Sequence, residues 1–401
     1  MMSQEESPIR DSKAQIFFRF LKFGLLAWGG PVAQIAMIRQ SLVEEEKWVS
    51  NERFNRALSV YQVLPGPEAH EMCVYFGMLA GGRWGGFLAG LGFMLPGFVL
   101  MMLLTWMYVQ FGLGSPVLMA VFSGFQVAVI ALIVNAVHRI SRHVLVSKKL
   151  LVIGFASFVA YVFGNPFYIV LPLAGLAHIF WNKGNKVMTA LVTIALVVSC
   201  ILFFSPKLFV AQEKMIAHDT HVQKVSTSLL SVFSAGLKAG SLTFGGAYTA
   251  VPFIREDAVE KKGWMTDPQF LDGIALSGVL PAPLIIFSTF VGYFGGGWVG
   301  AVVMTIGIFL PAFLFTLLGH QVMERIISNP ALHHFLDGVT AGVIGLIAMT
   351  AIQLFLSTIA DLFSLGLFGI ALFLLYRFKS KLTPAFVILG SGMVGLLIYF
   401  M

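Results

Sequence analysis

Charged residues are missing from long stretches of this chain. No Asp, Glu, Lys or Arg occurs in residues 84–137, 150–182, 187–206, 273–323, 338–360 or 382–401. A helix of about 20 apolar residues crosses the ~30 Å hydrocarbon core of a bilayer, so several of these stretches are long enough for more than one crossing. The pattern predicts an all-α polytopic membrane protein.

Glycine and proline interrupt this apolar pattern and divide it into segments. Two sets of six segments flank one segment that has no counterpart, residues 187–206. The predicted spans of the first set are 16–40, 54–80, 84–110, 116–138, 149–163 and 166–181. Those of the second set are 229–254, 269–294, 298–319, 332–358, 361–377 and 383–401.

The two sets are copies of one unit. A glycine-broken pattern recurs at a constant separation, because 245 − 29 and 281 − 65 both equal 216. The positions that recur are Lys22, Gly29, Arg39, Trp48, Phe54 and Pro65, which return as Lys238, Gly245, Arg255, Trp264, Phe270 and Pro281. A period of this kind indicates a duplication. We therefore divide the chain into a first repeat (1–185), a connector helix and loop (186–225) and a second repeat (226–401).

The single connector segment sets the orientation of the repeats. An odd number of crossings between the copies places the second repeat in the opposite orientation to the first. With a cytoplasmic N terminus, most Lys and Arg residues fall in inner segments, as the positive-inside rule requires. The outer segments then hold Arg39, Lys47, Arg53, Arg56, Lys207, Lys214 and Lys224. The C terminus is expected outside. Inverted repeats are typical of transporters whose substrate site lies near the midplane.

Composition excludes several other classes of protein. Hydrophobic residues make up 58% of the chain and charged residues 11%, which is outside the range of soluble domains. The net charge of +7 lies between spans, so we expect no nucleic-acid partner. Cys73 and Cys200 show no ligand spacing. His218 and His221 are interpreted as loop residues and His333-His334 as an interface pair, so neither a metal nor a cofactor is expected.

The breaks in the repeated spans are the predicted substrate site. Glycine and proline end or kink a helix, and the freed backbone groups must pack in protein or line a polar cavity. A half-helix that starts at such a break directs its N–H groups and positive dipole end inward, which suits an anion. The alternative is that these residues only produce kinks. The break residues are Gly29, Gly30, Pro31, Pro65, Gly66, Pro67, Gly245, Gly246, Pro281 and Pro283.

Four cations accompany the breaks. Lys22 and Lys238 precede them by about two helical turns and are predicted to bind the substrate, since an ionisable group inside a span is usually functional. Lys22 has the alternative of snorkelling to the headgroups. Arg39 and Arg255 follow the breaks and are predicted to gate or charge the entrance. Interface anchoring is the alternative for both arginines.

The second break differs between the repeats. Glu68, His70 and Glu71 follow Pro67, whereas the offset positions in the second repeat are apolar. Glu and His inside a transporter span are candidate proton relays, so we predict that these three residues handle protons. The alternative is that Glu68 and His70 cap freed backbone N–H groups.

These motifs together resemble the chromate transporter family. The resemblance rests on Trp28-Gly-Gly-Pro31, Gln62-Val-Leu-Pro-Gly-Pro67, Gly81-Gly-Arg-Trp-Gly-Gly86 and Phe93-Met-Leu-Pro96, with echoes at Thr243-Phe-Gly-Gly246, Leu280-Pro-Ala-Pro283 and Phe309-Leu-Pro311. It covers nearly the whole chain in the long, two-domain form. It implies an inner-membrane carrier that exports chromate and confers resistance, with proton or potential coupling and with sulfate as competitor. Ala247 and Ala282 replace Pro31 and Gly66, which departs from a symmetric pair of sites.

The leading hypothesis is a secondary transporter that exports chromate by alternating access. Uptake of sulfate or another oxyanion by the same site remains an alternative, as does a passive anion channel. An enzyme is not expected, because the spans contain no paired carboxylates and no nucleophile–base spacing. The expected partners are chromate, sulfate and the lipid bilayer, with a homodimer left open.

Overall fold

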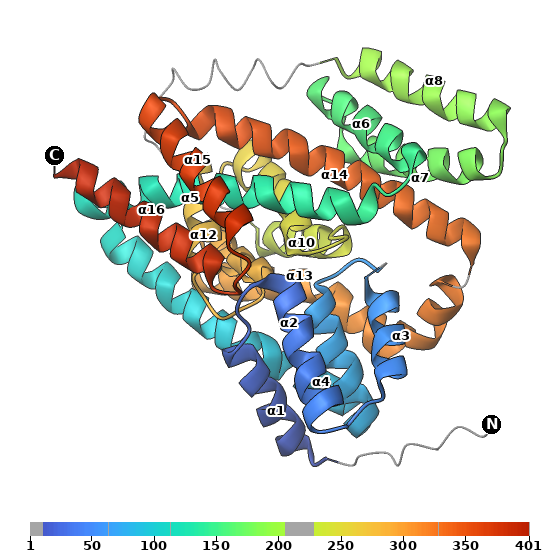
Figure 1. The fold of residues 1–401 in the computed structure, drawn as a ribbon, viewed down its shortest axis with the longest axis horizontal. Helices are drawn as coiled ribbons and strands as arrows, with labels where there is room; N and C mark the ends of the chain where they lie inside the picture. Colours follow the sequence, from blue (N-terminus) through green and yellow to red (C-terminus); the bar gives the residue numbers. More distant parts are fainter. Residues whose placement is uncertain (1–10, 63, 113, 205–227, 328, 401) are drawn as a thin grey trace.

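The computed structural model describes residues 11–62, 64–112, 114–204, 228–327 and 329–400, without the side chains of 320–327. These residues form helices joined by short turns, without a strand in the described ranges (Figure 1). The predicted all-α class is confirmed. The first repeat contains α1 (Lys13–Leu25), α2 (Gly30–Arg39), η1 (Gln40–Glu45), α3 (Asn51–Tyr61), α4 (Glu68–Met107), η2 (Tyr108–Gly112), α5 (Pro116–Val144), α6 (Lys148–Val162) and α7 (Phe167–Asn182).

The connector is α8 (Lys186–Leu202), and the predicted loop after it, with His218 and His221, lies outside the described residues. The second repeat contains α10 (Leu229–Ser241), η3 (Ala247–Ala250), α11 (Val251–Arg255), η4 (Glu256–Lys261), α12 (Asp267–Gly278), η5 (Leu284–Ile286), α13 (Phe287–Ile327), α14 (Pro330–Thr358), α15 (Leu362–Arg377) and α16 (Thr383–Tyr399).

Four described helical stretches are long and apolar enough to cross a membrane: Glu68–Gly112, Pro116–Val144, Leu284–Gly319 and Pro330–Thr358. Helices α7, α8, α15 and α16 are shorter and also apolar. The protein is therefore an integral membrane protein with several crossings, as the charge-free stretches predicted.

Glycine pairs divide the two longest helices into a short arm and a long arm. Gly82 and Gly297 have φ values of 61° and 62°, in the left-handed region that favours glycine. The turn in α4 brings Gly77 of the short arm against Gly85 and Ala89 of the long arm. The arms of α4 are thus antiparallel neighbours, and Gly292 against Gly300 makes the same contact in α13.

Hairpins replace four of the predicted single spans. In the span predicted at 16–40, the Arg19 side chain in α1 bonds Glu46, just after η1, and lies over the Trp48 ring. The chain therefore returns to the end from which α1 started. In the span predicted at 54–80, Phe54 of α3 stacks on Phe76 of α4 with ring centroids 5.4 Å apart. The reason is length, since the 13 residues of α1 extend only about 20 Å at 1.5 Å per residue.

The second repeat forms the same two hairpins. Gly295 lies against both Val232 at the start of α10 and Trp264 beyond η4, so the two ends of this hairpin lie close together. Phe270 of α12 contacts Phe287, with centroids 5.7 Å apart. Hairpins at 229–254 and 269–294 thus correct the prediction of single spans there. All four hairpins have the glycine and proline breaks at their tips.

The two repeats are inverted and interlocked. The long arms of α4 and α13 run antiparallel, because Gly86 lies against Leu317 and Gly90 against Phe313. Helix α5 packs against α15 and α16 of the other repeat, and α14 packs against α6 and α7 (Figure 1). Each long central helix is thus held by the short hairpin of the opposite repeat.

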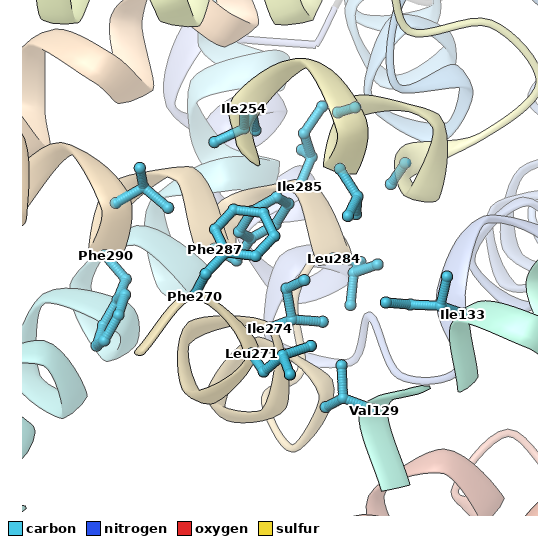
Figure 2. Packing of buried hydrophobic residues seen from close by; sticks show 14 of the residues in the cluster. Val129, Ile133, Ile254, Phe270, Leu271, Ile274, Leu284, Ile285, Phe287 and Phe290 are labelled. Carbon is cyan, nitrogen blue, oxygen red and sulfur yellow. The ribbon is translucent and has the colours of Figure 1, made fainter. Parts of the chain in front are cut away.

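An apolar cluster fills the space around the second break of the second repeat. Figure 2 shows Leu284 and Phe287 packed with Phe270 and Ile254 from neighbouring elements, while Ile133 approaches from α5. Leu284 and Phe287 occupy the positions that are Glu68 and Glu71 in the first repeat. The sequence difference therefore separates a polar tip from an apolar one.

Candidate functional site

The hairpin tips meet in pairs across the two repeats. The Gly66 N–H donates to the Thr243 carbonyl at 2.8 Å, joining the second break of one repeat to the first break of the other. The equivalent positions are Ala282 and Ala27, since both pairs are 216 positions apart. There the Gln34 amide is inserted, donating to the carbonyls of Ala27 at 3.0 Å and Ala282 at 3.2 Å. One pair of hairpin tips is therefore joined by a direct backbone hydrogen bond, whereas the Gln34 side chain lies between the tips of the equivalent pair.

A cavity of about 990 Å³ lies beside the pair of hairpin tips that Gln34 bridges. Gly29 and Gly30 of the first break line it, with Leu280 and Ala282 from the second break of the other repeat. The first turn of α2 has no side-chain cap and borders the cavity, which leaves its N–H groups available to a ligand. The predicted convergence of a broken half-helix on a cavity is thus present at the first break.

The cavity is strongly cationic. The basic residues among its lining side chains are Arg139, Arg142, Lys379, Lys381, His138 and His143. Asp and Glu are absent from its described lining. Guanidinium groups hydrogen-bond carboxylates and tetrahedral oxyanions through two parallel N–H donors. A site with this lining favours anions over cations and neutral solutes.

The same cleft occurs a second time, almost closed. Helices α5 and α14 begin 214 positions apart, 330 − 116, so Asn135 and Arg139 correspond to Met349 and Gln353. Met349 and Gln353 line a pocket of only about 40 Å³, together with Tyr161, Asn165 and Arg255. One conformation therefore contains an open and a closed version of one cleft.

Ion pairs hold the closed cleft together. Arg255 donates to both carboxylate oxygens of Asp267 at 2.7 and 2.8 Å, to Glu260 at 2.6 Å and to the Gln353 amide oxygen at 3.2 Å. It is buried, with 7% of its surface exposed. A buried guanidinium needs such partners, because an unpaired charge in this position costs several kcal/mol.

The corresponding arginine at the open cleft is held loosely. Arg39 donates to the Asn51 amide oxygen at 2.8 Å and lies 3.9 Å from Glu44. Asn51 is the counterpart of Asp267, so this arginine has a neutral acceptor where Arg255 has a carboxylate. Of the two arginines predicted to gate the entrance, Arg255 is buried, tightly paired and lines the closed cleft, whereas Arg39 is half-buried and is not part of the open cavity's lining.

The two lysines predicted to bind substrate lie away from the cavity. Lys238 pairs with Asp257 at 2.5 Å and Glu256 at 3.8 Å, and its Nζ lies 5.2 Å from the centroid of the Phe167 ring. Two carboxylates thus compensate its charge. Lys22 is exposed and is not part of the cavity lining. The remaining break residues that do not line the cavity are Pro31, Pro65, Gly66, Pro67, Gly245, Gly246, Pro281 and Pro283.

The predicted proton-handling residues are buried, and none of the three is part of the cavity lining. Glu68 interacts electrostatically with Arg139, which also lies near Tyr248 of the other repeat. Glu71 lies behind Glu68, and its carboxylate oxygens make no hydrogen bond with any described residue. Of the three residues, Glu68 interacts electrostatically with a cation of the cavity lining.

His70 is enclosed by aromatic rings. Its ring centroid lies 4.9 Å from that of Phe309 and 4.7 Å from that of Phe313. Neither ring nitrogen has a hydrogen-bond partner among the described residues. His70 thus lies in an apolar cage between the long arms of the two repeats.

Sequence reasoning used the cavity's cations only to orient the chain. Arg139, Arg142, Lys379 and Lys381 follow apolar spans, where basic residues mark the inner side. One signal was available in the turn between α15 and α16. This turn contains Lys379 and Lys381, whereas the equivalent turn between α6 and α7, at Gly164 and Asn165, is uncharged. That α5 and α15 bring these residues together depends on the interlocking of the repeats.

Comparisons with known proteins agree with this architecture. A chromate transport protein of Pseudomonas aeruginosa is 51% identical over 402 residues, which cover 98% of this chain and 94% of that protein. A chromate transport protein of Cupriavidus metallidurans is 30% identical, with 96% and 93% covered. An uncharacterized transporter of Bacillus subtilis, YwrA, is 28% identical over 172 residues, 41% of this chain and 93% of that protein. No solved structure matches the chain.

The family profile described as Chromate transporter matches residues 14–211 and 230–396. These two ranges cover nearly the whole chain and each contains one set of hairpins. The resemblance seen in the sequence motifs is confirmed, and the chain belongs to the chromate transporter family.

Proposed function

We propose that this protein is a secondary-active transporter that exports chromate by alternating access between its two inverted repeats. The observation that carries the proposal is the pair of equivalent clefts, one open to about 990 Å³ and the other closed to about 40 Å³. Exchanging the conformations of residues 1–185 and 226–401 would close the first cleft and open the second. The names of the Pseudomonas and Cupriavidus relatives support chromate as the substrate.

The chemistry of the open cleft suits a tetrahedral dianion. Arg139 and Arg142 offer paired N–H donors, and the uncapped start of α2 adds backbone donors and a positive dipole end. Lys379 and Lys381 add charge at the opposite wall. Sulfate has the same shape and charge as chromate, so we expect it to compete for this site.

The open cleft faces the cytoplasm in this proposal. The hairpin at α1–η1 returns residues 39–56 to the end where the chain starts, so Arg39, Lys47, Arg53 and Arg56 move from the predicted outer side to the inner one. By the same argument the hairpin of the second repeat moves Arg255, Lys261 and Lys262 from the predicted inner side to the outer one. Basic residues still gather mostly on the cytoplasmic side, as the positive-inside rule requires. The long arm of α4, α5 and α8 still give an odd number of crossings, which keeps the N terminus inside and the C terminus outside.

Charge asymmetry between the clefts supports export. The lining of the open cleft holds basic side chains and no described Asp or Glu, whereas the arginine of the closed cleft is neutralised by Asp267 and Glu260. An anion would therefore bind tightly on the inner side and weakly on the outer side. The membrane potential supplies the driving force, worth about 2.3 kcal/mol per charge and 100 mV for an anion leaving a negative interior.

The test is uptake of labelled chromate by inverted membrane vesicles under an imposed potential. We expect accumulation by the wild type, inhibition by sulfate, and a loss of about 10–100-fold in apparent affinity in Arg139→Gln, because a charged hydrogen bond is worth roughly 1.5–3 kcal/mol. Lys148→Gln is the matched control, since it removes a positive charge from an exposed position outside the cavity. Equal uptake by Arg139→Gln would contradict the assignment. Sulfate uptake into right-side-out vesicles, without chromate accumulation in inverted ones, would favour an importer.

A further inference from the structure

Three side chains with metal-ligand chemistry meet between the repeats, away from the anion cavity. They are His178 on α7 and His334 and Asp337 on α14, and one ligand atom from each lies within 4.8 Å of the other two. We propose that these residues bind one divalent first-row transition ion of the zinc type. The proposal is independent of the transported anion, because none of the three lines either cleft.

His178 is already oriented as a metal-binding histidine. Its Nδ1 lies 2.7 Å from the His334 backbone oxygen. A carbonyl only accepts hydrogen bonds, so Nδ1 carries the proton and Nε2 keeps its lone pair. Metal-binding histidines characteristically fix their tautomer through such a bond from the other ring nitrogen. The Asn182 amide now donates to Nε2 at 2.8 Å and occupies the direction that an ion would take.

The two ligands on α14 are equally well placed. His334 and Asp337 are three positions apart, so they lie on the same face of the helix. The Nδ1 atom of His334 is buried and has no hydrogen-bond partner among the described residues. A buried, unsatisfied ring nitrogen costs about 1–3 kcal/mol, and coordination of an ion would remove that cost.

The ligand set selects the kind of ion. Two imidazoles and a carboxylate suit zinc, cobalt or nickel, whereas calcium and magnesium prefer oxygen ligands. Ligands bound tetrahedrally at about 2.0–2.1 Å from zinc are roughly 3.4 Å apart, so small side-chain rotations would complete the site. A water molecule would supply the fourth ligand, because the Asn182 amide oxygen accepts a hydrogen bond from the Lys149 ammonium at 2.9 Å.

The site exists on one side of the pseudo-symmetric molecule only. The equivalent positions on α16 and α5 are Val394, Ala120 and Ser123, which carry no comparable ligand set. The ion would therefore join the short hairpin of the first repeat to α14 of the second. Because α14 also lines the closed cleft, the ion would stabilise the helix group α6, α7 and α14 as one unit.

The experiment uses the full chain, purified in detergent without a polyhistidine tag, stripped with a chelator and titrated with zinc. Bound metal is counted by elemental analysis after gel filtration. We expect one tightly bound equivalent in the wild type, loss of that equivalent in His178→Ala and His334→Ala, and at least tenfold weaker binding in Asp337→Asn. Substitution by cobalt should give the visible absorption of a tetrahedral site in the wild type and not in His178→Ala or His334→Ala.

His333→Gln is the matched control, because it removes the neighbouring imidazole, which lies 3.7 Å from the Asp337 carboxylate, and keeps a polar side chain beside that ligand. It should retain the equivalent. The proposal is overturned if the wild type binds no zinc in this range, or if His178→Ala and His334→Ala bind as much as the wild type. Asp337→Asn preserves the shape of the side chain, so we expect this variant to remain monodisperse in gel filtration. Weakened zinc binding by a monodisperse variant would show that a ligand has been lost and that the protein has not misfolded.

Discussion

At the residue scale, the electrostatic interaction between Glu68 and Arg139 bears on coupling. Glu68 is buried and interacts electrostatically with Arg139 and with Glu71 on its own helix. A charged Glu68 would compete with the substrate for Arg139, whereas a protonated Glu68 leaves that guanidinium free. We therefore expect the anion and one proton to bind together.

The prediction is that Glu68→Gln removes the pH dependence of chromate binding. In the wild type, one coupled proton changes the affinity by up to about tenfold per pH unit, with binding weakening as pH rises. The amide mimics the protonated acid, so the variant should bind chromate at mildly basic pH as the wild type does at acidic pH. Equilibrium binding to the purified protein measures this, and the comparison of the two proteins cancels the titration of chromate itself. Parallel pH profiles would show that Glu68 is not the coupling group.

Single residues also show where sequence reasoning stops. The prediction for Lys238 followed from a lysine within an apolar stretch, but its partners Glu256 and Asp257 come near it only because the chain turns back. Arg139 is the converse case, since its position after a span is typical of a topology signal. Electrostatic roles depend on contacts between segments, which spacing along one chain does not contain.

At the element scale, the equivalent arginines of the two repeats hold their hairpins with different partners. Arg255 binds the Asp267 carboxylate at the closed cleft, and Arg39 binds the Asn51 amide at the open one. Asp267→Asn would replace the carboxylate partner of Arg255 with an amide, which is the partner that Arg39 has. Losing a buried ionic partner costs up to about 3–5 kcal/mol, and the neutral amide recovers part of this.

Hydrogen exchange measures that difference locally. In Asp267→Asn we expect the slow amides of residues 251–261 to exchange roughly 10–100-fold faster, because the opening free energy of this segment falls by about 1–3 kcal/mol. Lys262→Gln serves as control, since it removes an exposed charge from the same hairpin. Unchanged exchange in Asp267→Asn would mean that the ion pair does not hold the cleft closed.

The elements themselves were largely predictable. Apolar stretches gave α4, α5, α13 and α14, and the glycine and proline pairs gave the positions of the breaks. The direction of the chain after each break was not predictable, because a kink and a reversal use the same residues. Helix length decides between them once α1 and α3 are seen to be too short to cross.

At the scale of the whole molecule, the sequence predicts the pseudo-symmetry of the repeats but does not predict which of the two clefts is open. The constant offset and the odd connector predicted two inverted repeats, and the antiparallel long arms agree with this. Which of the two equivalent clefts is open depends on a free-energy difference between two packings of the same chain. The Gly66–Thr243 bond and the Gln34 insertion show which packing this structure has.

Alternating access predicts that the two clefts exchange accessibility during transport. Asn135 lines the open cleft, and its counterpart Met349 lines the closed one with 2% of its surface exposed. In a background with Cys73→Ala and Cys200→Ser, we expect Asn135→Cys to react with an impermeant thiol reagent from the cytoplasmic face. Met349→Cys should resist the reagent from both faces at rest.

Chromate turnover under a membrane potential should reverse this pattern, because each transport cycle passes through the state in which the second cleft is open. Labelling of Met349→Cys should then rise several-fold from the outer face, while labelling of Asn135→Cys slows. The two positions are equivalent under the pseudo-symmetry, so each serves as the control for reagent and for expression. If both cysteines label from the cytoplasmic face, or if turnover leaves both rates unchanged, the clefts do not alternate. A channel with one continuous pathway would instead expose both positions at the same time.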